Sequence, residues 1–139
     1  MKMTTPIKLT VIALATTFGL AFAAAADTAQ LPPASTKTGV TYATDIKPIF
    51  DQSCIKCHSG DKPKAHLKLD TLENALKGGT DGKVVTPGDS AKSPLVLNVA
   101  HLSKDHDSWM PPAHNKANIG SLTPEQIGLI RAWIDQGAK

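Results

Sequence analysis

Cysteine and aromatic side chains are scarce in this sequence, which has two Cys, two Trp, one Tyr and three Phe among 139 residues. A small secreted domain with few large apolar side chains usually needs several disulfides to hold it together. The two cysteines, Cys54 and Cys57, are only three positions apart and cannot form such a framework. We therefore expect something other than side chains and disulfides to fill the centre of the fold.

Strong charge of either sign is also lacking. The formal net charge is +3 at pH 7, and no cluster of Lys or Arg is interleaved with aromatic residues. Proteins that bind nucleic acid usually carry such a basic patch. We therefore expect no nucleic-acid partner.

The first 26 residues have the layout of a secretory signal peptide. Lys2 and Lys8 precede an uncharged stretch, residues 9–26, whose last residues are Ala24, Ala25 and Ala26. Cleavage after Ala26 would remove two basic residues and no acidic one, which lowers the formal net charge to +1. A retained membrane anchor stays an alternative, because an uncharged run of roughly 18 residues reaches the lower limit for spanning a bilayer. We predict an exported, periplasmic protein that meets a membrane only if the leader is retained.

One folded domain is expected after the leader. Residues 27–41 contain two prolines and a Ser/Thr-rich stretch with almost no large apolar residue, which predicts a flexible linker. Residues 42–139 suffice for one ordinary domain and contain no internal repeat. Gly and Pro punctuate the middle of this region, and no run of alternating strands is visible. We predict an all-α domain with long irregular loops.

Helices are marked most clearly at the two ends of this domain. The first is predicted to begin near Thr44, with Asp45 at the positive end of the helix dipole. The last should begin at residues 123–126, whose Thr, Pro and Gln have the arrangement of a capping box. Shorter helices are predicted over residues 71–77 and from Ser93 onward.

The motif with the clearest chemistry is C-x-x-C-H, formed by Cys54, Cys57 and His58. This is the attachment signature of c-type haem. Residues three apart share one face of a helix, so both sulfurs can reach the two vinyl groups of one porphyrin. His58 follows at once and can ligate the iron, while its other ring nitrogen is free to donate to a backbone carbonyl. We predict one covalently attached haem c, held by these three residues.

Zinc binding and thiol redox chemistry are the alternatives for this cysteine pair. His101 and His106 would supply the second half of a zinc site in an interaction domain. However, 43 residues separate Cys57 from His101, unlike the short loop of a zinc finger. A thioredoxin-like motif should follow a strand in a βαβ context, and no such strand is visible. Haem is therefore favoured over zinc and over a disulfide.

Met110 is the expected sixth ligand of the iron. Met1 and Met3 leave with the leader, so Met110 is the only thioether of the mature protein. Pro111 and Pro112 follow it and stiffen the segment. A lone Met more often fills a gap in a core, but a haem motif 52 positions upstream favours ligation. The competing histidines, which we expect on the surface, are His66, His101, His106 and His114.

An ordered series of short motifs resembles the c-type cytochromes, and more closely the planctomycete-type cytochrome c domain. Besides the C-x-x-C-H motif and Met110-Pro111-Pro112, the series comprises Ile46-Lys47-Pro48-Ile49-Phe50, Leu67-Lys68-Leu69-Asp70, Gly78-Gly79, Pro87-Gly88-Asp89, Trp133-Ile134 and Gly137-Ala138. The likeness extends from Tyr42 to Ala138. It implies a cytochrome c fold in which the first and last helices cross near one edge of the haem. It also implies ligation by His58 and Met110, with Phe50 and Trp133 as haem contacts.

These inferences predict an electron carrier rather than an enzyme. An iron with two protein ligands leaves no position for substrate, so we expect outer-sphere electron transfer and no catalytic residue. The alternatives are a haem-based sensor and an electron-accepting subunit of a larger oxidoreductase, followed by a zinc-stabilised interaction domain. The expected partners are redox proteins, and an acidic one would be attracted to a mild positive rim formed by Lys56, Lys62, Lys64 and Lys68.

Overall fold

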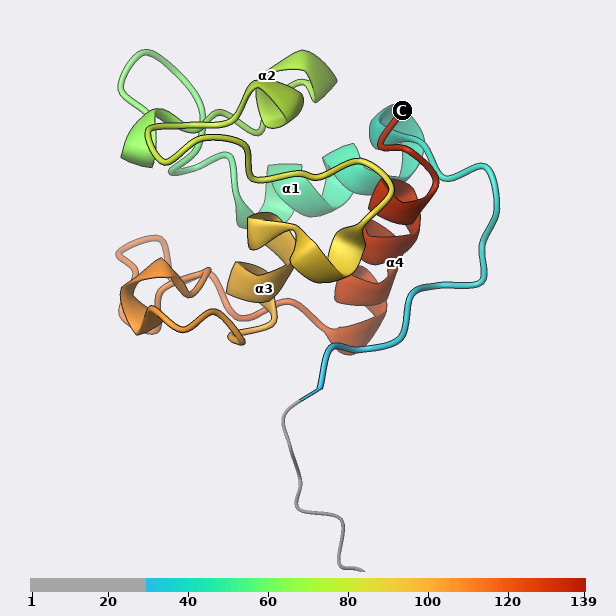
Figure 1. Ribbon diagram of the computed structural model, residues 1–139. Helices are drawn as coiled ribbons and strands as arrows, with labels where there is room; N and C mark the ends of the chain where they lie inside the picture. Colours follow the sequence, from blue (N-terminus) through green and yellow to red (C-terminus); the bar gives the residue numbers. More distant parts are fainter. Residues whose placement is uncertain (1–29) are drawn as a thin grey trace, which may run out of the picture.

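The computed structural model describes residues 30–139, and Figure 1 shows how their helices are arranged. Within this range the structure has no β-strand, only an isolated bridge between Gly79 and Gly82. No helix of the range is both long and apolar enough to cross a bilayer. The predicted leader and the first three residues of the predicted linker lie outside the described residues.

The α-helices are α1 (Lys47–Ser53), α2 (Leu72–Lys77), α3 (Pro94–Val99) and α4 (Pro124–Asp135). The described part is thus a small helical domain, as the all-α prediction requires.

The last helix, α4, begins where the sequence predicted. The Thr123 hydroxyl accepts the Gln126 N–H at 3.2 Å, and the Gln126 side chain accepts the Thr123 N–H at 2.9 Å. This capping box satisfies two backbone donors that a helix end would otherwise leave free. One face of α4 then supplies much of the core, namely Ile127, Ile130, Trp133 and Ile134.

The two short helices are also confirmed. The Thr71 hydroxyl caps α2 by accepting the Asn74 N–H at 3.1 Å, so this helix occupies residues 72–77 of the predicted 71–77. Ser93 precedes α3 as its N-cap residue, and Pro94 stands at the first helical position, where its missing N–H costs nothing.

The first helix begins earlier than predicted. A π-helical turn, η1 (Tyr42–Ile46), precedes α1 and is capped by Thr41, whose hydroxyl accepts the Thr44 N–H. The helical stretch begins at Tyr42, so the predicted start near Thr44 was two residues late. The error arose because Thr44 and Asp45 serve inside this first turn, where both bond back toward Thr41.

Three aromatic rings form the centre of the core between the first and last helices. Tyr42, Phe50 and Trp133 pack with ring centroids 5.9 to 6.4 Å apart, and Phe50 meets Trp133 edge to face at 89°. Such edge contacts stabilise a core beyond the area that they bury. The Trp133 indole N–H and the Tyr42 backbone N–H both donate to the Lys139 carbonyl, at 3.0 and 2.9 Å. The C-terminal end is thus tied to the same cluster.

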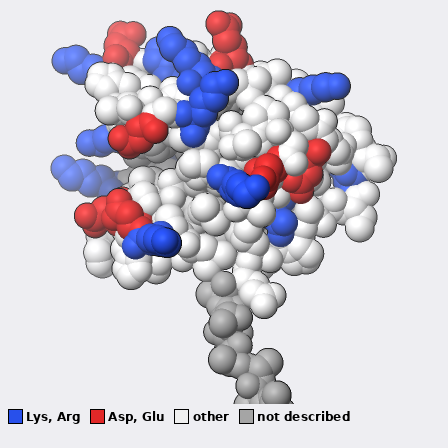
Figure 2. Space-filling model, viewed as in Figure 1, with Lys and Arg blue, Asp and Glu red and all other residues white. Residues whose placement is uncertain are grey.

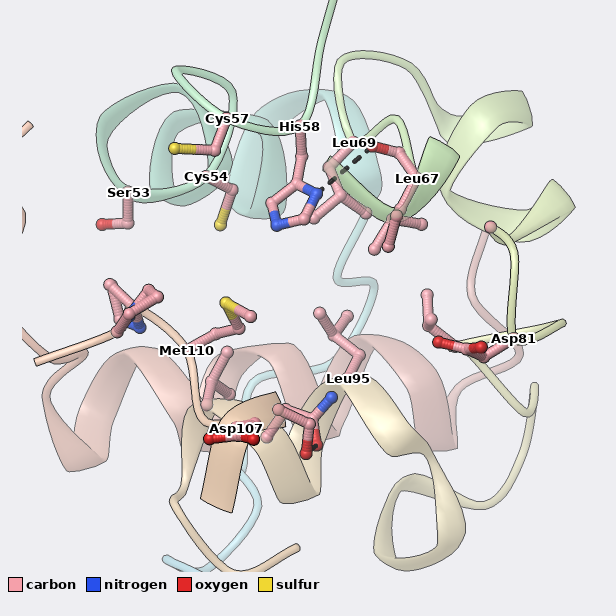
Figure 3. A pocket seen from close by; sticks show the side chains of 18 of the residues that line it. Ser53, Cys54, Cys57, His58, Leu67, Leu69, Asp81, Leu95, Asp107 and Met110 are labelled. Carbon is pink, nitrogen blue, oxygen red and sulfur yellow. Dashed lines mark hydrogen bonds between the residues drawn. The ribbon is translucent and has the colours of Figure 1, made fainter. Parts of the chain in front are cut away.

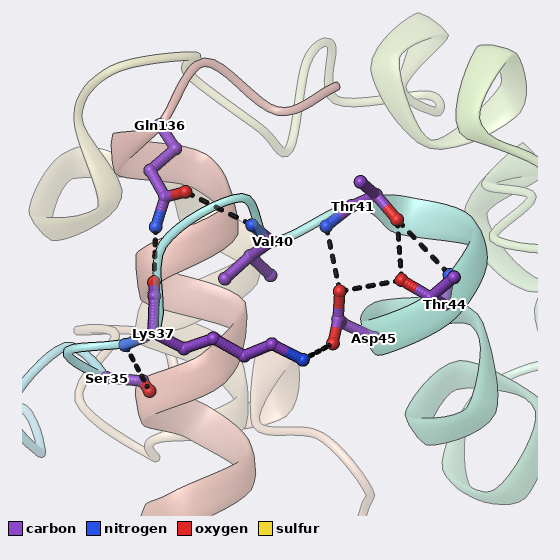
Figure 4. Close-up of polar contacts among 7 residues, drawn as sticks. All are labelled: Ser35, Lys37, Val40, Thr41, Thr44, Asp45 and Gln136. Atoms are coloured by element: carbon purple, nitrogen blue, oxygen red, sulfur yellow. Dashed lines mark hydrogen bonds and ion pairs between the residues drawn. The ribbon is translucent and has the colours of Figure 1, made fainter.

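The N-terminal segment (residues 30–41) packs along α4 rather than lying free. Its Ser35 N–H donates to the Gly128 carbonyl at 2.9 Å, and Arg131 donates to the Pro32 carbonyl. Figure 4 shows that the Gln136 amide bridges the segment by donating to Lys37 and accepting from Val40. This packing was not predicted, because a flexible linker was expected over residues 27–41.

Candidate cofactor site

A cavity of about 300 Å³ lies between the segment that follows α1 and the segment that follows α3. Its volume falls at the lower end of the roughly 300–1,000 Å³ typical of cofactor and ligand pockets. Apolar side chains dominate the lining, and they include Ala65, Leu67, Leu69, Val84, Leu95, Val99, Ile119 and Leu122. Three exposed carboxylates also border the cavity, from Asp81, Asp105 and Asp107.

The cysteine turn forms one wall of the cavity, as Figure 3 shows. Helix α1 ends at Ser53, and the chain turns so that the Cys57 and His58 N–H groups donate to the Cys54 carbonyl at 3.1 and 3.0 Å. Cys54 and Cys57 are free thiols that both line the cavity. Both thiols lie on the same wall of the cavity, but on a turn beyond α1 rather than on the helical turn that was predicted. Burial, with a smaller contribution from Cys57, raises the pKa of the Cys54 thiol to about 12, so this thiol is neutral.

His58 enters the same wall with a fixed ring orientation. Its Nδ1 lies 3.3 Å from the Leu67 carbonyl, and because a carbonyl only accepts, Nδ1 carries the proton. Burial lowers the pKa of His58, against smaller opposing contributions from hydrogen bonds to the backbone of Leu67 and Lys64. The imidazole is therefore neutral at pH 7. Figure 3 shows its other nitrogen directed into the cavity, where its lone pair is available to a metal.

Backbone bonds from the segment after the cysteine turn hold His58 in place. The Leu69 N–H donates to the His58 carbonyl at 2.8 Å, and the Tyr42 hydroxyl donates to the Leu69 carbonyl at 2.8 Å. Burial, aided by nearby Asp51 and Asp70, raises the pKa of Tyr42 to about 12, which keeps its hydroxyl a donor. The sequence predicted that the His58 ring would donate to a backbone carbonyl. It did not identify Leu67 as the residue with that carbonyl, or Tyr42 as the residue that bonds to the neighbouring Leu69.

Met110 lies on the wall opposite His58. Figure 3 shows its sulfur directed into the cavity toward the side that carries Cys54 and His58. The Met110 N–H donates to the Asn98 carbonyl at 3.0 Å, which anchors the segment to the end of α3. The structure thus brings Cys54, Cys57, His58 and Met110 to one cavity.

The other four histidines do not line this cavity. His101 and His106 both pack against Trp109, with ring centroids 5.1 and 4.2 Å from the indole. Within residues 30–139, no three His, Cys, Asp or Glu side chains are grouped to hold a metal ion. The zinc alternative therefore has no support in this geometry.

Phe50 and Trp133 do not line the cavity either, although the resemblance implied that both would contact haem. Both side chains are fully buried and pack against each other. Their place is in the core behind the cavity wall. The first and last helices do meet through this aromatic pair, but the two rings pack against each other instead of lining the cavity.

A small helical domain that presents a C-x-x-C-H turn to an apolar cavity has the features of a cytochrome c-like domain. Residues 54–114 match the family model described as Planctomycete cytochrome C, and this match supports a cytochrome c-like domain. The match confirms the resemblance over a shorter range than the predicted Tyr42 to Ala138. Searches of curated proteins and of solved structures found no match. Domains of this class bind haem c and generally transfer electrons rather than catalyse reactions.

The cavity fits haem c in its chemistry. Its lining is mainly apolar, which suits a porphyrin. A neutral imidazole nitrogen and a thioether face each other across it, and both are good ligands for haem iron. Two unpaired thiols lie beside the imidazole, on the same wall of the cavity.

Proposed function

We propose that this protein is an exported carrier of single electrons with one haem c. The observation that carries the proposal is the placement of His58 and Met110 on opposite walls of one cavity, with both free thiols beside His58. Cys54 and Cys57 would hold the porphyrin through thioethers, and His58 Nε2 and Met110 Sδ would ligate the iron. When bound, haem c supplies a one-electron couple whose potential is raised by a Met ligand. The proposed compartment is the periplasm, with the leader cleaved after Ala26.

The protein's own residues serve this function by excluding water and fixing the ligands. The Leu67 carbonyl holds the His58 ring, so little movement of that ligand is expected when the charge of the site changes. If His58 and Met110 both ligated the iron, no position would remain for substrate. No catalytic residue is therefore proposed.

The Met110 ligand separates a carrier from a haem-based sensor. The purified holoprotein should show a thioether–iron absorption band when oxidised, and it should bind carbon monoxide poorly when reduced. Met110→Ala should abolish the band and bind carbon monoxide readily, because it opens the sixth position. His114→Ala changes an exposed residue outside the cavity lining and is the matched control. Ready carbon monoxide binding by the unaltered protein would favour the sensor and contradict the carrier.

The proposed partner is a redox protein with an acidic docking surface. Three exposed lysines lie within or just after the cysteine turn, namely Lys56, Lys62 and Lys64. None of them forms an ion pair within the described residues. Figure 2 shows basic side chains over the lobe that this segment forms with α2, with acidic side chains among them. Clustered charge of one sign raises association rates in a salt-dependent way.

A charge reversal tests this docking surface. Lys62→Glu with Lys64→Glu should slow electron transfer to an acidic small redox protein by about tenfold or more at low ionic strength, and much less at high salt. Lys92→Glu, on the turn η3 (Ser90–Lys92) that packs on α4, is the control. Stopped-flow mixing measures the rates. An equal loss in both variants would show that this lobe is not the docking surface.

A further inference from the structure

Three consecutive residues, Ser108 to Met110, are attached to the C-terminal end of α3. The Ser108 hydroxyl donates to the Asn98 side chain at 3.1 Å, and the Met110 N–H donates to the Asn98 carbonyl at 3.0 Å. His101 Nε2 lies 3.3 Å from the Met110 carbonyl, so this nitrogen carries a proton and donates. Both backbone polar groups of Met110 are therefore bonded to the same short stretch, residues 98–101.

His101 makes a second contact with this segment through the face of its ring. The imidazole lies parallel to the Trp109 indole, with 2° between the planes and 5.1 Å between the centroids. The indole N–H in turn donates to the Ser103 carbonyl at 3.0 Å. One side chain thus contacts both Trp109 and Met110, and its ring cannot rotate without losing either the stack or the hydrogen bond.

The backbone at His101 has a conformation that residues other than Gly rarely adopt. Its φ is +57°, which is the left-handed conformation. Such a conformation persists where surrounding contacts fix it, and it is found preferentially at functional sites. Here it directs the ring of a residue just past α3 back toward the segment that carries Met110.

We infer that His101 is a positioning residue that holds the Met110 sulfur at the iron. The inference rests on the proposed ligation by Met110. A methionine side chain has three rotatable bonds, so the place of its sulfur depends on how firmly its backbone is held. Loss of the His101 hydrogen bond lets the backbone of Met110 shift and weakens the bond between sulfur and iron, although His101 itself touches neither atom.

Competition by an added ligand measures this effect. The ferric holoprotein is titrated with imidazole, which must displace the sulfur in order to bind. His101→Phe keeps a flat ring against Trp109 but removes the donor, and its affinity for imidazole should rise about 5- to 10-fold, the usual net effect of one hydrogen bond. Its reduction potential should fall, because a Met ligand raises the potential. His114→Phe makes the same change at an exposed histidine and should match the unaltered protein.

Two further variants separate positioning from folding. His101→Gln retains an N–H donor, so it should restore much of the original resistance to imidazole. If His101→Phe does not accumulate as holoprotein, His101→Leu is used, and it should show at least the same gain in imidazole affinity. Denaturant unfolding of each holoprotein checks that the fold is retained.

The outcomes distinguish this inference from the proposed function. If the unaltered protein shows the thioether–iron band, yet His101→Phe and His114→Phe bind imidazole equally, the positioning role is wrong and the ligation by Met110 stands. If the unaltered protein lacks that band and binds imidazole freely, the proposed ligation fails and this inference fails with it.

Discussion

Backbone carbonyls, more than side chains, hold the individual residues of the cavity. The Leu67 carbonyl orients His58, and the Asn98 carbonyl anchors Met110. The C-x-x-C-H spacing predicted which residues would line the site, and counting the thioethers left after the leader predicted Met110. The partners could not be predicted, because a carbonyl becomes a partner only through a tertiary contact that no local pattern encodes. The four residues singled out in this way, Cys54, Cys57, His58 and Met110, all line one cavity, whereas the carbonyl partners Leu67 and Asn98 were not singled out.

Asp45 is the residue whose charge most clearly ties the N-terminal segment to the first helix. Its carboxylate accepts from Lys37, from the Thr41 N–H and from the Thr44 hydroxyl, as Figure 4 shows. These hydrogen bonds, led by that of Lys37, lower the pKa of Asp45 to about 2 from 3.8. The folded state therefore favours the ionised form. The resulting stabilisation is complete above the unfolded pKa near 3.8 and disappears as the pH falls through about 2.

A pH series on Asp45→Asn measures this contribution. The unaltered protein should lose more stability between about pH 5 and pH 2 than the variant does, since the variant has no carboxylate to protonate. Denaturant unfolding of the two holoproteins at each pH gives the difference. Asp51→Asn removes an exposed carboxylate paired with Lys47 and should differ little from the unaltered protein. Equal pH dependence in Asp45→Asn and the unaltered protein would contradict the assignment.

At the scale of elements, the N-terminal segment and α4 approach each other more closely than any side chain would allow. Gly128 lies where the two meet, and a Cβ built on it would be 2.6 Å from the Pro33 carbonyl oxygen. Glycine in a helix is otherwise unfavourable by roughly 1 kcal/mol relative to alanine. The capping box of α4 was predictable because its signal spans four consecutive residues. The packing of residues 30–41 was not, because a stretch of Pro, Ser and Thr contains no apolar pattern that indicates what it will lie against.

Gly128→Ala tests whether this packing stabilises the fold. In the full chain, the added methyl group should lower the free energy of unfolding by about 1–3 kcal/mol, because a backbone atom must move to admit it. In a chain that lacks residues 27–36, the same substitution should instead be neutral or stabilising by up to about 1 kcal/mol, as helix propensity then dominates. Denaturant unfolding of the four proteins completes the cycle. Stabilisation in both backgrounds would mean that the segment does not pack on α4 in solution.

Across the whole molecule, the large side chains are unevenly distributed. Tyr42, Phe50 and Trp133 form one cluster between the first and last helices, whereas the region between the cysteine turn and Met110 encloses a cavity. The scarcity of aromatics and cysteines predicted that side chains alone would not fill the fold. The position of the cavity could not be predicted, since it depends on how loops far apart in sequence come together.

The protein without its proposed cofactor should consequently be poorly folded. Cys54→Ala with Cys57→Ala prevents covalent attachment, and the purified variant should show reduced helical circular dichroism and no sharp thermal transition. Small domains are marginally stable, and a group that is held only by the folded chain stabilises the folded state. His66→Ala with His114→Ala, two exposed positions outside the cavity lining, should leave the transition intact. Cooperative unfolding of the double cysteine variant at the temperature of the unaltered protein would contradict this view.

Covalent attachment of one haem to Cys54 and Cys57 can be tested directly. The most direct measurement is the absorption spectrum and intact mass of the protein, exported together with a cytochrome maturation system and then denatured and extracted with acidified organic solvent. We expect the colour to stay with the polypeptide and the mass to exceed that of the cleaved chain by one haem. A colourless protein, or a pigment that passes into the organic solvent, would show that no haem is attached to these cysteines.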